Sequence, residues 1–455
     1  MDFIKILLIA IGYCVVAPIG GFFVAQERYL KDFVCILLIF CLSLHVDTTV
    51  LMVDSIEWYR GVTKGYEFSI MEMLAITLIF ATIFDPKTKF VFLPLGTLPW
   101  FLYVFASSLS VFQAIEVSYV FMNILKFAKI WLVVYAIANY VRSRHEVQTV
   151  LVGLCTMLIY QFFVVAKLKL IDGVYQNYGT FEHQNPLAMY TYMAALPILA
   201  AAMSSTVKAK LSILYFITFA CSGLIVYATL SRAALAVMAV GIVAVIVVGF
   251  FDKFSKRRFI ITASICIGGV FVLIMTIDTI MGRFVDHGNE ASEQTRQVMN
   301  LAAKAMMEDK AVGVGWNNFA VAVNHPFPYG DVIDNWNLDR GYNVDEDYAK
   351  GVVESHYWLI KSENGIFAYY AYMFFILYTL FRGFHIIFTR RGSYAAAIVA
   401  GIFIAFALTY LHSNLERVLT QTKNLFLWMI YLGVLGAIIR IPAAEFEPPR
   451  KEDEE

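Results

Sequence analysis

The sequence predicts an all-α, polytopic membrane protein with about 12–13 transmembrane helices and one large extracytoplasmic loop domain. Three observations lead to this fold class. Of the 455 residues, 60% are hydrophobic and only 15% are charged, against about 25% charged in an ordinary soluble domain. Apolar runs of roughly 20 residues recur from end to end, each long enough to cross about 30 Å of hydrocarbon. One long polar stretch, residues 282–355, interrupts them. A β-barrel would instead show short segments of alternating hydrophobicity.

The apolar runs define thirteen candidate spans. They lie near residues 4–24, 33–51, 68–84, 91–111, 118–140, 147–166, 186–203, 209–228, 230–250, 259–278, 357–381, 394–412 and 424–440. The first run has one lysine and no small-residue cleavage site, so we expect a spanning helix and not a signal peptide. If this run crosses fully, the N-terminus lies outside. If it does not, there are twelve spans and the N-terminus lies inside.

Lysine and arginine in the short connections predict the orientation. One set of connections, together with the C-terminal tail, holds eighteen such residues, and the opposite set holds seven. The richer set includes the cluster Lys256-Arg257-Arg258 and is expected to be cytoplasmic. We therefore expect the polar stretch 282–355 to face outward, away from the cytoplasm.

The polar stretch divides the chain into four predicted parts. Residues 1–281 form an N-terminal bundle of transmembrane helices, 282–355 the loop domain, 356–440 the C-terminal transmembrane helices, and 441–455 a cytoplasmic tail. The stretch 282–355 holds twelve acidic and six basic residues, a net charge of 6 − 12 = −6. Its polarity excludes a place in hydrocarbon.

Composition also excludes several classes of function. The chain has no net charge, so it lacks the basic footprint of a nucleic-acid-binding protein. The six cysteines all lie in apolar runs and suggest neither a disulfide framework nor a zinc site. We expect no metal and no cofactor. The acidic run Asp345-Glu346-Asp347 could bind a cation, but a solvated acidic turn is the simpler interpretation.

Three residues that flank the loop domain are the first candidates for chemistry. Arg232 stands at the predicted outer end of a span, Arg296 lies on a predicted amphipathic helix that runs on to Met307, and His356 stands where the chain re-enters the membrane. Two arginines can bind a diphosphate bidentately, and a histidine can accept a proton from an attacking hydroxyl. Each has a simpler interpretation too. Arg232 could anchor a helix end, Arg296 could pair with Glu293, and His356 could be an interfacial residue with a satisfied ring.

Other polar residues are further candidates for substrate binding. Lys126 and Lys129 are three residues apart on one helix face, and could meet phosphate, pair with a carboxylate such as Glu72, or snorkel at a helix end. His412 and Arg417 lie on the predicted outer side and could line an acceptor path; an ordinary polar loop is the alternative.

Four short motifs, taken in order, resemble those of one family. They are Thr180–Ala188 with Asn185 before Pro186-Leu187-Ala188, Ser231-Arg232-Ala233-Ala234-Leu235, Gly313-Val314-Gly315-Trp316-Asn317-Asn318-Phe319, and His356-Tyr357-Trp358-Leu359 with Glu363-Asn364-Gly365. The combination resembles the O-antigen ligase and Wzy-type O-antigen (exopolysaccharide) polymerase superfamily, over roughly residues 70 to 440. One departure is Tyr357, where the family has an asparagine.

The resemblance implies a metal-independent, C-type glycosyltransferase of the cell envelope, acting in lipopolysaccharide or exopolysaccharide biosynthesis. Such proteins move a glycan from an undecaprenyl diphosphate carrier to an acceptor hydroxyl on the outer face of the inner membrane. By motif match, Arg232 and Arg296 would hold the diphosphate, and His356 would be the base or would orient the acceptor. Asn185 and Glu363 enter as further candidates for substrate binding because they lie in the matched motifs.

Two other classes of function compete with the enzyme. A transporter of a small solute built on the same superfamily fold would be expected to show internal repeats and broken helices near the midplane; we see no repeat. A structural scaffold does not explain Arg232 and His356 together. The sequence leaves polymerase and ligase open. The two differ in the acceptor, which is another glycan, a lipid A core or a protein.

Overall fold

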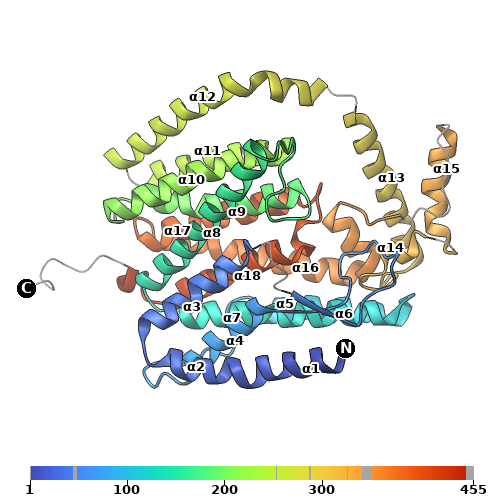
Figure 1. Ribbon diagram of the computed structural model, residues 1–455, viewed down its shortest axis with the longest axis horizontal. Coiled ribbons are helices and arrows are strands. Elements are labelled where there is room, and N and C mark those ends of the chain that lie inside the picture. Colours follow the sequence, from blue (N-terminus) through green and yellow to red (C-terminus); the bar gives the residue numbers. More distant parts are fainter. Residues whose placement is uncertain are drawn as a thin grey trace, which may run out of the picture.

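The computed structural model describes residues 2–44, 49–252, 254–285, 288–324, 326–340 and 350–446 (Figure 1). Within these residues helices dominate, with one two-stranded antiparallel sheet. The elements are α1 (Asp2–Ile11), η1 (Gly12–Val16), α2 (Ala17–Ala25), α3 (Arg28–Cys41), β1 (Thr49–Met52), β2 (Tyr66–Ser69), α4 (Ile70–Ile83), α5 (Thr97–Ser108), η2 (Leu109–Gln113), α6 (Val117–Lys129), α7 (Trp131–Tyr140), α8 (Arg144–Leu170), α9 (Gln184–Met203), α10 (Ala209–Thr229), α11 (Arg232–Asp252), α12 (Lys256–Val285), α13 (Gly288–Asp309), α14 (Phe319–Ala322), η3 (Pro328–Gly330), α15 (Asp331–Asp339), α16 (His356–Thr389), α17 (Tyr394–His412), η4 (Val418–Thr420), α18 (Thr422–Arg440) and η5 (Ala443–Phe446).

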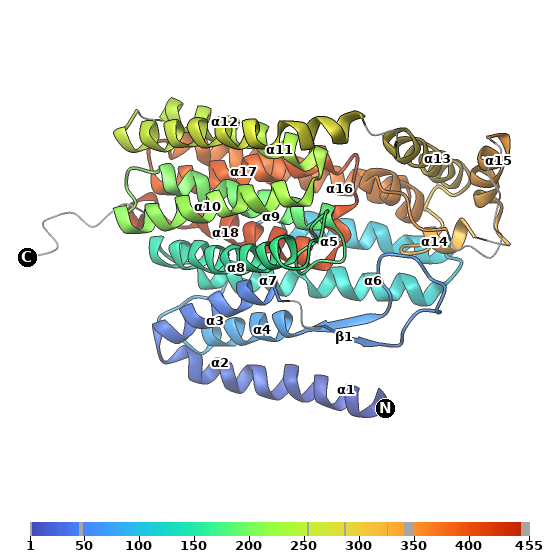
Figure 2. The same cartoon turned by 45° about the horizontal axis from the view of Figure 1, so that its top comes forward.

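The long helices lie side by side in a bundle (Figures 1 and 2). We call the end that carries α13, α14 and α15 the loop end, and the opposite end, where α18 finishes, the tail end. Nine helices of the described part are long and apolar enough to cross a membrane. The predicted all-α polytopic fold is therefore confirmed. Every predicted span has a helical counterpart, although α3, α4 and α5 contain only 14, 14 and 12 residues.

One predicted span was too long. The run 33–51 was expected to be helical throughout, but α3 ends at Cys41 and the strand β1 follows at Thr49. β1 pairs with β2 in the register Thr49↔Ser69 to Met52↔Tyr66. Threonine and valine favour strands, and the run's unbroken apolar character hid the change from helix to strand.

Local sequence explains several helix starts. At α4, the Ser69 side chain accepts from the Glu72 amide while the Glu72 side chain bonds the Ser69 amide. Ser143 and Glu146 form the same reciprocal cap at α8. Such a capping box satisfies backbone donors that a helix start otherwise leaves unpaired.

Helix α9 occupies the middle of the bundle and is buried from Pro186 to Met203. It packs against α10, α17 and α11. Because α9 begins at the loop end, its first residues, including Asn185, are placed where several helix ends meet.

Residues of the polar stretch belong to a second hydrophobic core, separate from that of the long helices. Ala302, Ala303 and Met306 of α13 pack with Phe319 and its neighbours in α14. Tyr59, Tyr119 and Met122 from the N-terminal part also belong to this core. The predicted amphipathic helix through Arg296 to Met307 is present as α13.

Helix α16 is broken at Gly365, and the turn at Gly313 closes the break. Gly365 has φ +83° and Gly313 has φ +85°. The amides of Val314 and Gly315 donate to the carbonyls of Ser362 (2.9 Å) and Glu363 (3.1 Å), and Ile366 donates to Ala311 (3.1 Å).

Both glycines are sterically required. A Cβ on Gly313 would lie 2.1 Å from the Glu363 carbonyl oxygen, and one on Gly365 would lie 2.5 Å from Val312. The Gly-x-Gly motif and the Glu-Asn-Gly motif are thus two halves of one contact.

Candidate active site

The first turn of α9 carries Asn185 into a polar cluster at the loop end. His183 caps the helix, with its ring nitrogen Nδ1 facing the Asn185 amide at 3.4 Å. The Asn185 side chain donates from Nδ2 to Glu416 Oε1 at 2.8 Å. Asn185 therefore connects the start of α9 to the loop that follows α17.

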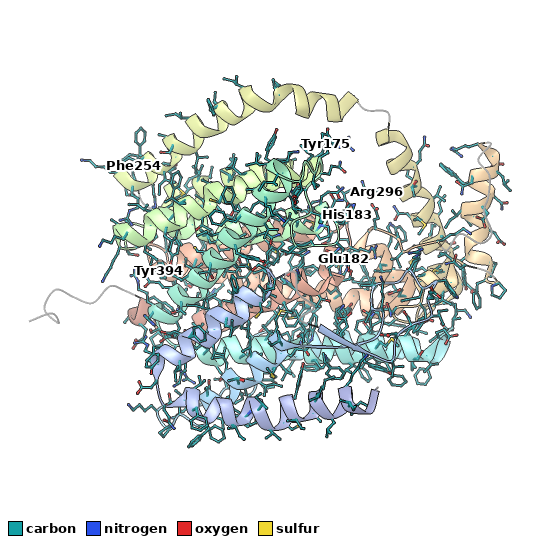
Figure 3. The ribbon with its side chains drawn as sticks, in the orientation of Figure 1. Tyr175, Glu182, His183, Phe254, Arg296 and Tyr394 are labelled. Atoms are coloured by element: carbon teal, nitrogen blue, oxygen red, sulfur yellow. The ribbon has the colours of Figure 1, made fainter. Side chains whose placement is uncertain are left out.

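Arg296 of α13 reaches the same carboxylate. Its Nη2 donates to Glu416 Oε1 at 2.9 Å, and its Nε donates to Glu354 Oε2. Figure 3 shows Arg296 at the same end of the bundle as Glu182 and His183. The guanidinium is thus held by two carboxylates from separate segments. The alternative pairing with Glu293 lies outside what is described, since the Glu293 side chain is not placed.

Arg417 lies next to these groups. Partial burial lowers the pKa of the Arg417 guanidinium, while the carboxylates of Glu354, Glu416 and Glu363 oppose this effect. Burial raises the pKa of Glu416 to about 7, and the charge of Glu354 adds to the rise; Arg296 and Arg417 act in the opposite direction. Glu416 is therefore a carboxyl group that changes protonation near neutral pH.

His356 is the first residue of α16 and contacts the segment that leads to Glu416. Its amide donates to the Ser413 carbonyl at 2.9 Å, which joins the start of α16 to the end of α17. The residue is 2% exposed. Its ring packs edge-on against Tyr372, with centroids 5.2 Å apart. The family's asparagine is replaced by Tyr357, whose hydroxyl donates to the Tyr410 carbonyl of α17 at 2.7 Å.

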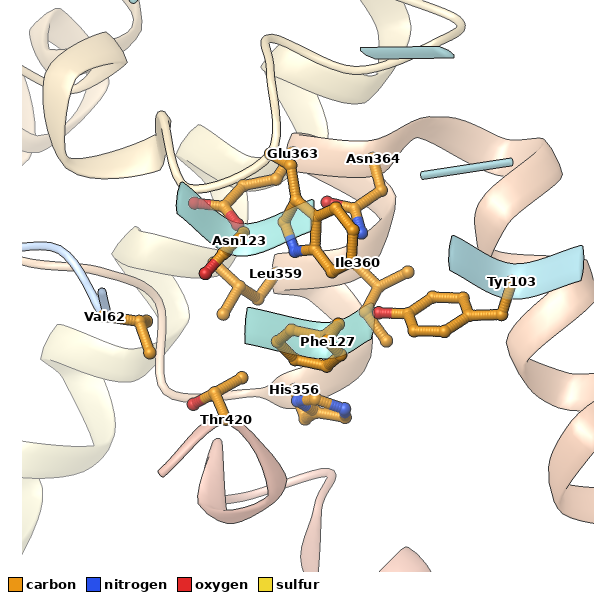
Figure 4. A pocket seen from close by; sticks show the side chains of 11 residues that line it. Val62, Tyr103, Asn123, Phe127, His356, Leu359, Ile360, Glu363, Asn364 and Thr420 are labelled. Carbon is orange, nitrogen blue, oxygen red and sulfur yellow. The ribbon is translucent and has the colours of Figure 1, made fainter. Parts of the chain in front are cut away.

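A small cavity lies beside the His356 ring (Figure 4). Glu363, Asn364, Asn123 and Thr420 also line it. Among the described residues, His356 Nδ1 and Asn364 Oδ1 are buried without a hydrogen-bond partner. Burying unpaired polar atoms is costly, so these two atoms mark a place where a polar partner belongs.

Glu363 has a structural task. Its Oε1 accepts from the Phe319 amide at 2.9 Å, at the start of α14. Its backbone carbonyl accepts from the Gly315 amide. The carboxylate thus fixes the turn of residues 313–319 against the broken α16. A role of Glu363 in binding substrate stays a prediction.

Lys126 and Lys129 are both bonded to carboxylates. Lys126 Nζ lies 3.2 Å from Glu67 Oε2, and Lys129 Nζ lies 2.9 Å from Glu72 Oε2. Tyr13 donates to the same Glu72 oxygen at 2.7 Å. The structure therefore has the pairing with Glu72 that was one of the predicted alternatives, and a phosphate contact for these lysines stays a prediction.

The other two candidates lie at the same end. His412 ends α17, and its Nδ1 is 3.3 Å from the Tyr192 hydroxyl of α9. Arg232 begins α11 with a partly buried side chain. The preceding helix α10 reaches the loop end, because the Ala228 carbonyl accepts from the Asn177 amide in the connection before α9.

Sequence reasoning missed Glu354 and Glu416. Glu354 was counted only among the acidic residues of the polar stretch, and Glu416 was overlooked beside Arg417. The available signal was an adjacent Glu-Arg pair in a short connection between two apolar runs.

The described residues contain no group of three histidine, cysteine or acidic side chains that could hold a metal ion. Asp345, Glu346 and Asp347 lie outside the described residues.

Comparison with known protein families finds one match within the chain. Residues 217–350 match the family model described as O-antigen ligase. The matched stretch runs from within α10 to shortly before α16 and contains Arg232 and Arg296. None of the curated proteins matches the chain. The motif-based prediction is confirmed over this stretch: residues 217–350 match the O-antigen ligase family, and the described residues form a multi-pass membrane protein.

Proposed function

We propose that this protein is a glycosyltransferase-type enzyme that transfers glycans, as its match to the O-antigen ligase family model implies. We propose that the donor is a glycan on undecaprenyl diphosphate, that the acceptor is a hydroxyl, and that transfer takes place at the loop end, on the outer face of the inner membrane. The observation that carries this proposal is the convergence at Arg296. Glu354 and Glu416, which are far apart in sequence, both accept from its guanidinium, and Asn185 donates to Glu416. Arg417 interacts electrostatically with the same two carboxylates.

The diphosphate would be held by arginines. Arg296 and Arg417 lie together in the cluster, and Arg232 is assigned to the diphosphate by the family motif. In the structure two carboxylates bond Arg296, so the donor would compete with them for the guanidinium. Glu354 is the one more easily displaced, because its side chain is 44% exposed and that of Glu416 only 14%. Arginine binds a phosphate with a planar fork, as it binds a carboxylate, which makes the exchange chemically reasonable.

His356 would act on the acceptor. Its Nδ1 is buried without a hydrogen-bond partner, and the residue lines the small cavity. A proton on Nδ1 leaves the lone pair on Nε2, the nitrogen that can take the hydroxyl proton. The hydroxyl oxygen then bonds to the anomeric carbon, the bond from that carbon to the diphosphate oxygen breaks, and undecaprenyl diphosphate leaves. Charge stabilisation by the arginines supplies what a metal ion provides in other enzymes.

Among the described residues, the broken helix α16 is a feature that resembles a transporter. In transporters, unwound backbone lines an ion site. Here the freed groups of Ser362, Glu363 and Ile366 are all bonded to the 311–315 turn, so the break serves packing and does not favour transport. Polymerase and ligase activity both fit the site, since only the acceptor differs.

The test is glycan transfer by the purified full-length protein with an undecaprenyl diphosphate-linked oligosaccharide, with and without EDTA. Arg296→Lys keeps the charge but loses the fork, so donor affinity should fall by about tenfold and turnover should fall too. Arg340→Lys is the control, because Arg340 stacks on Trp336 of α15. Transfer lost in EDTA and restored by magnesium would contradict the metal-independent mechanism. Equal effects of the two substitutions would contradict the assignment of Arg296.

A further inference from the structure

A second cavity lies at the tail end, the end of the bundle opposite the candidate active site. Its volume is about 430 Å³, within the usual range for sites of small organic ligands. It is formed by the last turns of α9, α11 and α16, the first turn of α12 and the first turns of α17. Residues that represent these helices are Met203, Val248, Phe388, Arg258 and Ala400.

The cavity exists because the side chains on one face of α17 are too small to fill the space between the helices. On α17, Ala396, Ala397 and Ala400 line the wall, and their side chains end at Cβ. Around the opening stand larger residues that remain exposed: Phe251 at 74%, Phe388 at 63% and Phe384 at 50%. A recess with apolar walls inside the membrane does not attract water, so an apolar chain is the suitable filling.

Two arginines give the cavity a charged rim. Arg258 is 4% exposed and donates from Nε to the Met203 carbonyl at 3.3 Å and from Nη1 to the Gly249 carbonyl at 2.5 Å. Arg391 is exposed and donates from Nη2 to the Phe251 carbonyl. That bond uses one of the five N–H donors of the Arg391 guanidinium. A positive group at the mouth of an apolar recess is the pattern that lipid head groups recognise between transmembrane helices.

We propose that this cavity is a binding site for an anionic phospholipid, with one acyl chain between α11, α16 and α17 and the phosphate on Arg391. The charge at the rim favours an anionic over a zwitterionic lipid. The location favours a phospholipid of the adjacent leaflet over the tail of the glycan carrier, whose diphosphate would be held at the other end of the bundle. The two sites share no residue, but the choice of a phospholipid over the glycan carrier rests on the proposed function.

The test is native mass spectrometry of the delipidated full-length protein with dioleoylphosphatidylglycerol or dioleoylphosphatidylcholine. Wild-type protein should retain phosphatidylglycerol about fivefold better, the effect of one arginine near the head group. Arg391→Gln should remove this preference. Ala400→Phe, which fills the cavity, should reduce retention of both lipids.

Matched controls lie outside the cavity. Lys210→Gln removes an equal charge from an exposed position in the first turn of α10. Ala236→Phe adds an equal volume at an exposed position of α11. Neither substitution should change lipid binding. If Ala400→Phe unfolds in thermal melts, Ala397→Leu replaces it.

Three results would overturn the proposal. The first is equal retention of the two lipids by the wild-type protein. The second is unchanged retention in both cavity-filling variants, which would place the bound lipid elsewhere. The third is displacement of phosphatidylglycerol by undecaprenyl phosphate at equal concentration, which would make the carrier the occupant.

Discussion

Replacing Glu416 with glutamine should remove a pH dependence from donor binding. Glu416 competes for Arg296 only when it is ionised, and burial raises its pKa to about 7. A bound diphosphate would raise this pKa further, because a nearby negative charge disfavours the ionised carboxyl. Donor binding therefore takes up a proton, and affinity falls as the pH rises.

The magnitude follows from the pKa. With a pKa of about 7, the ionised fraction of Glu416 rises from about one tenth at pH 6 to about nine tenths at pH 8. If only the protonated form admits the donor, wild-type affinity falls by about tenfold over this range. Glu416→Gln resembles the protonated form, so its affinity should match the wild type at pH 6 and exceed it by about tenfold at pH 8.

The assay is a titration of undecaprenyl diphosphate into the purified protein at pH 6, 7 and 8. The diphosphate also titrates, but equally for both proteins, so the difference between them isolates Glu416. Glu308→Gln on the exposed face of α13 is the control with the same change in charge. If wild type and Glu416→Gln show the same pH dependence, Glu416 does not compete with the donor for Arg296.

Three further predictions concern neighbouring positions. His356→Ala should lower turnover by about 10²–10⁴-fold with donor binding retained; near-normal turnover in His356→Gln would leave the histidine only an orienting role. Glu354→Gln should tighten donor binding by up to about fivefold, since an ion pair this exposed is worth at most about 1 kcal/mol; weaker binding would mean that Glu354 positions Arg296. Gly365→Ala should lower the thermal unfolding temperature more than Gly392→Ala does. Gly392 also has a positive φ (+86°), but no atom lies within 4 Å of the position that a Cβ would take. An equal drop in unfolding temperature for the two variants would show that the contact between position 365 and Val312 is unimportant.

Much of the fold could be predicted because hydrocarbon imposes a simple rule. A run of about 20 apolar residues that pairs all its backbone groups internally has to be a helix. The rule failed at 33–51, where an apolar run leaves the helix and pairs as a strand with Tyr66–Ser69. That pairing depends on a partner strand 14 to 20 residues away, from Met52↔Tyr66 to Thr49↔Ser69, which hydropathy does not detect.

The site was predictable only in part. Arg296 and His356 could be named because charged or titratable residues beside membrane spans are costly and usually have a purpose. Their neighbours could not be named. The Arg296–Glu416 bond joins residues 120 positions apart, and Glu354 is one acidic residue among twelve in its stretch. Contacts across such separations depend on how the helices pack, and no local pattern encodes that.

The closure of α16 by the 311–315 turn has a consequence for exchanging parts between relatives. The segment between α12 and α16 is long enough to be treated as an insert and replaced to change the acceptor. However, its turn supplies the amides that complete the backbone of α16 within ten residues of His356. A chimera that replaces residues 282–355 alone keeps Ser362, Glu363 and Gly365 but changes the turn that fits them. Transplants should therefore carry residues 311–319 and 356–366 from the same parent.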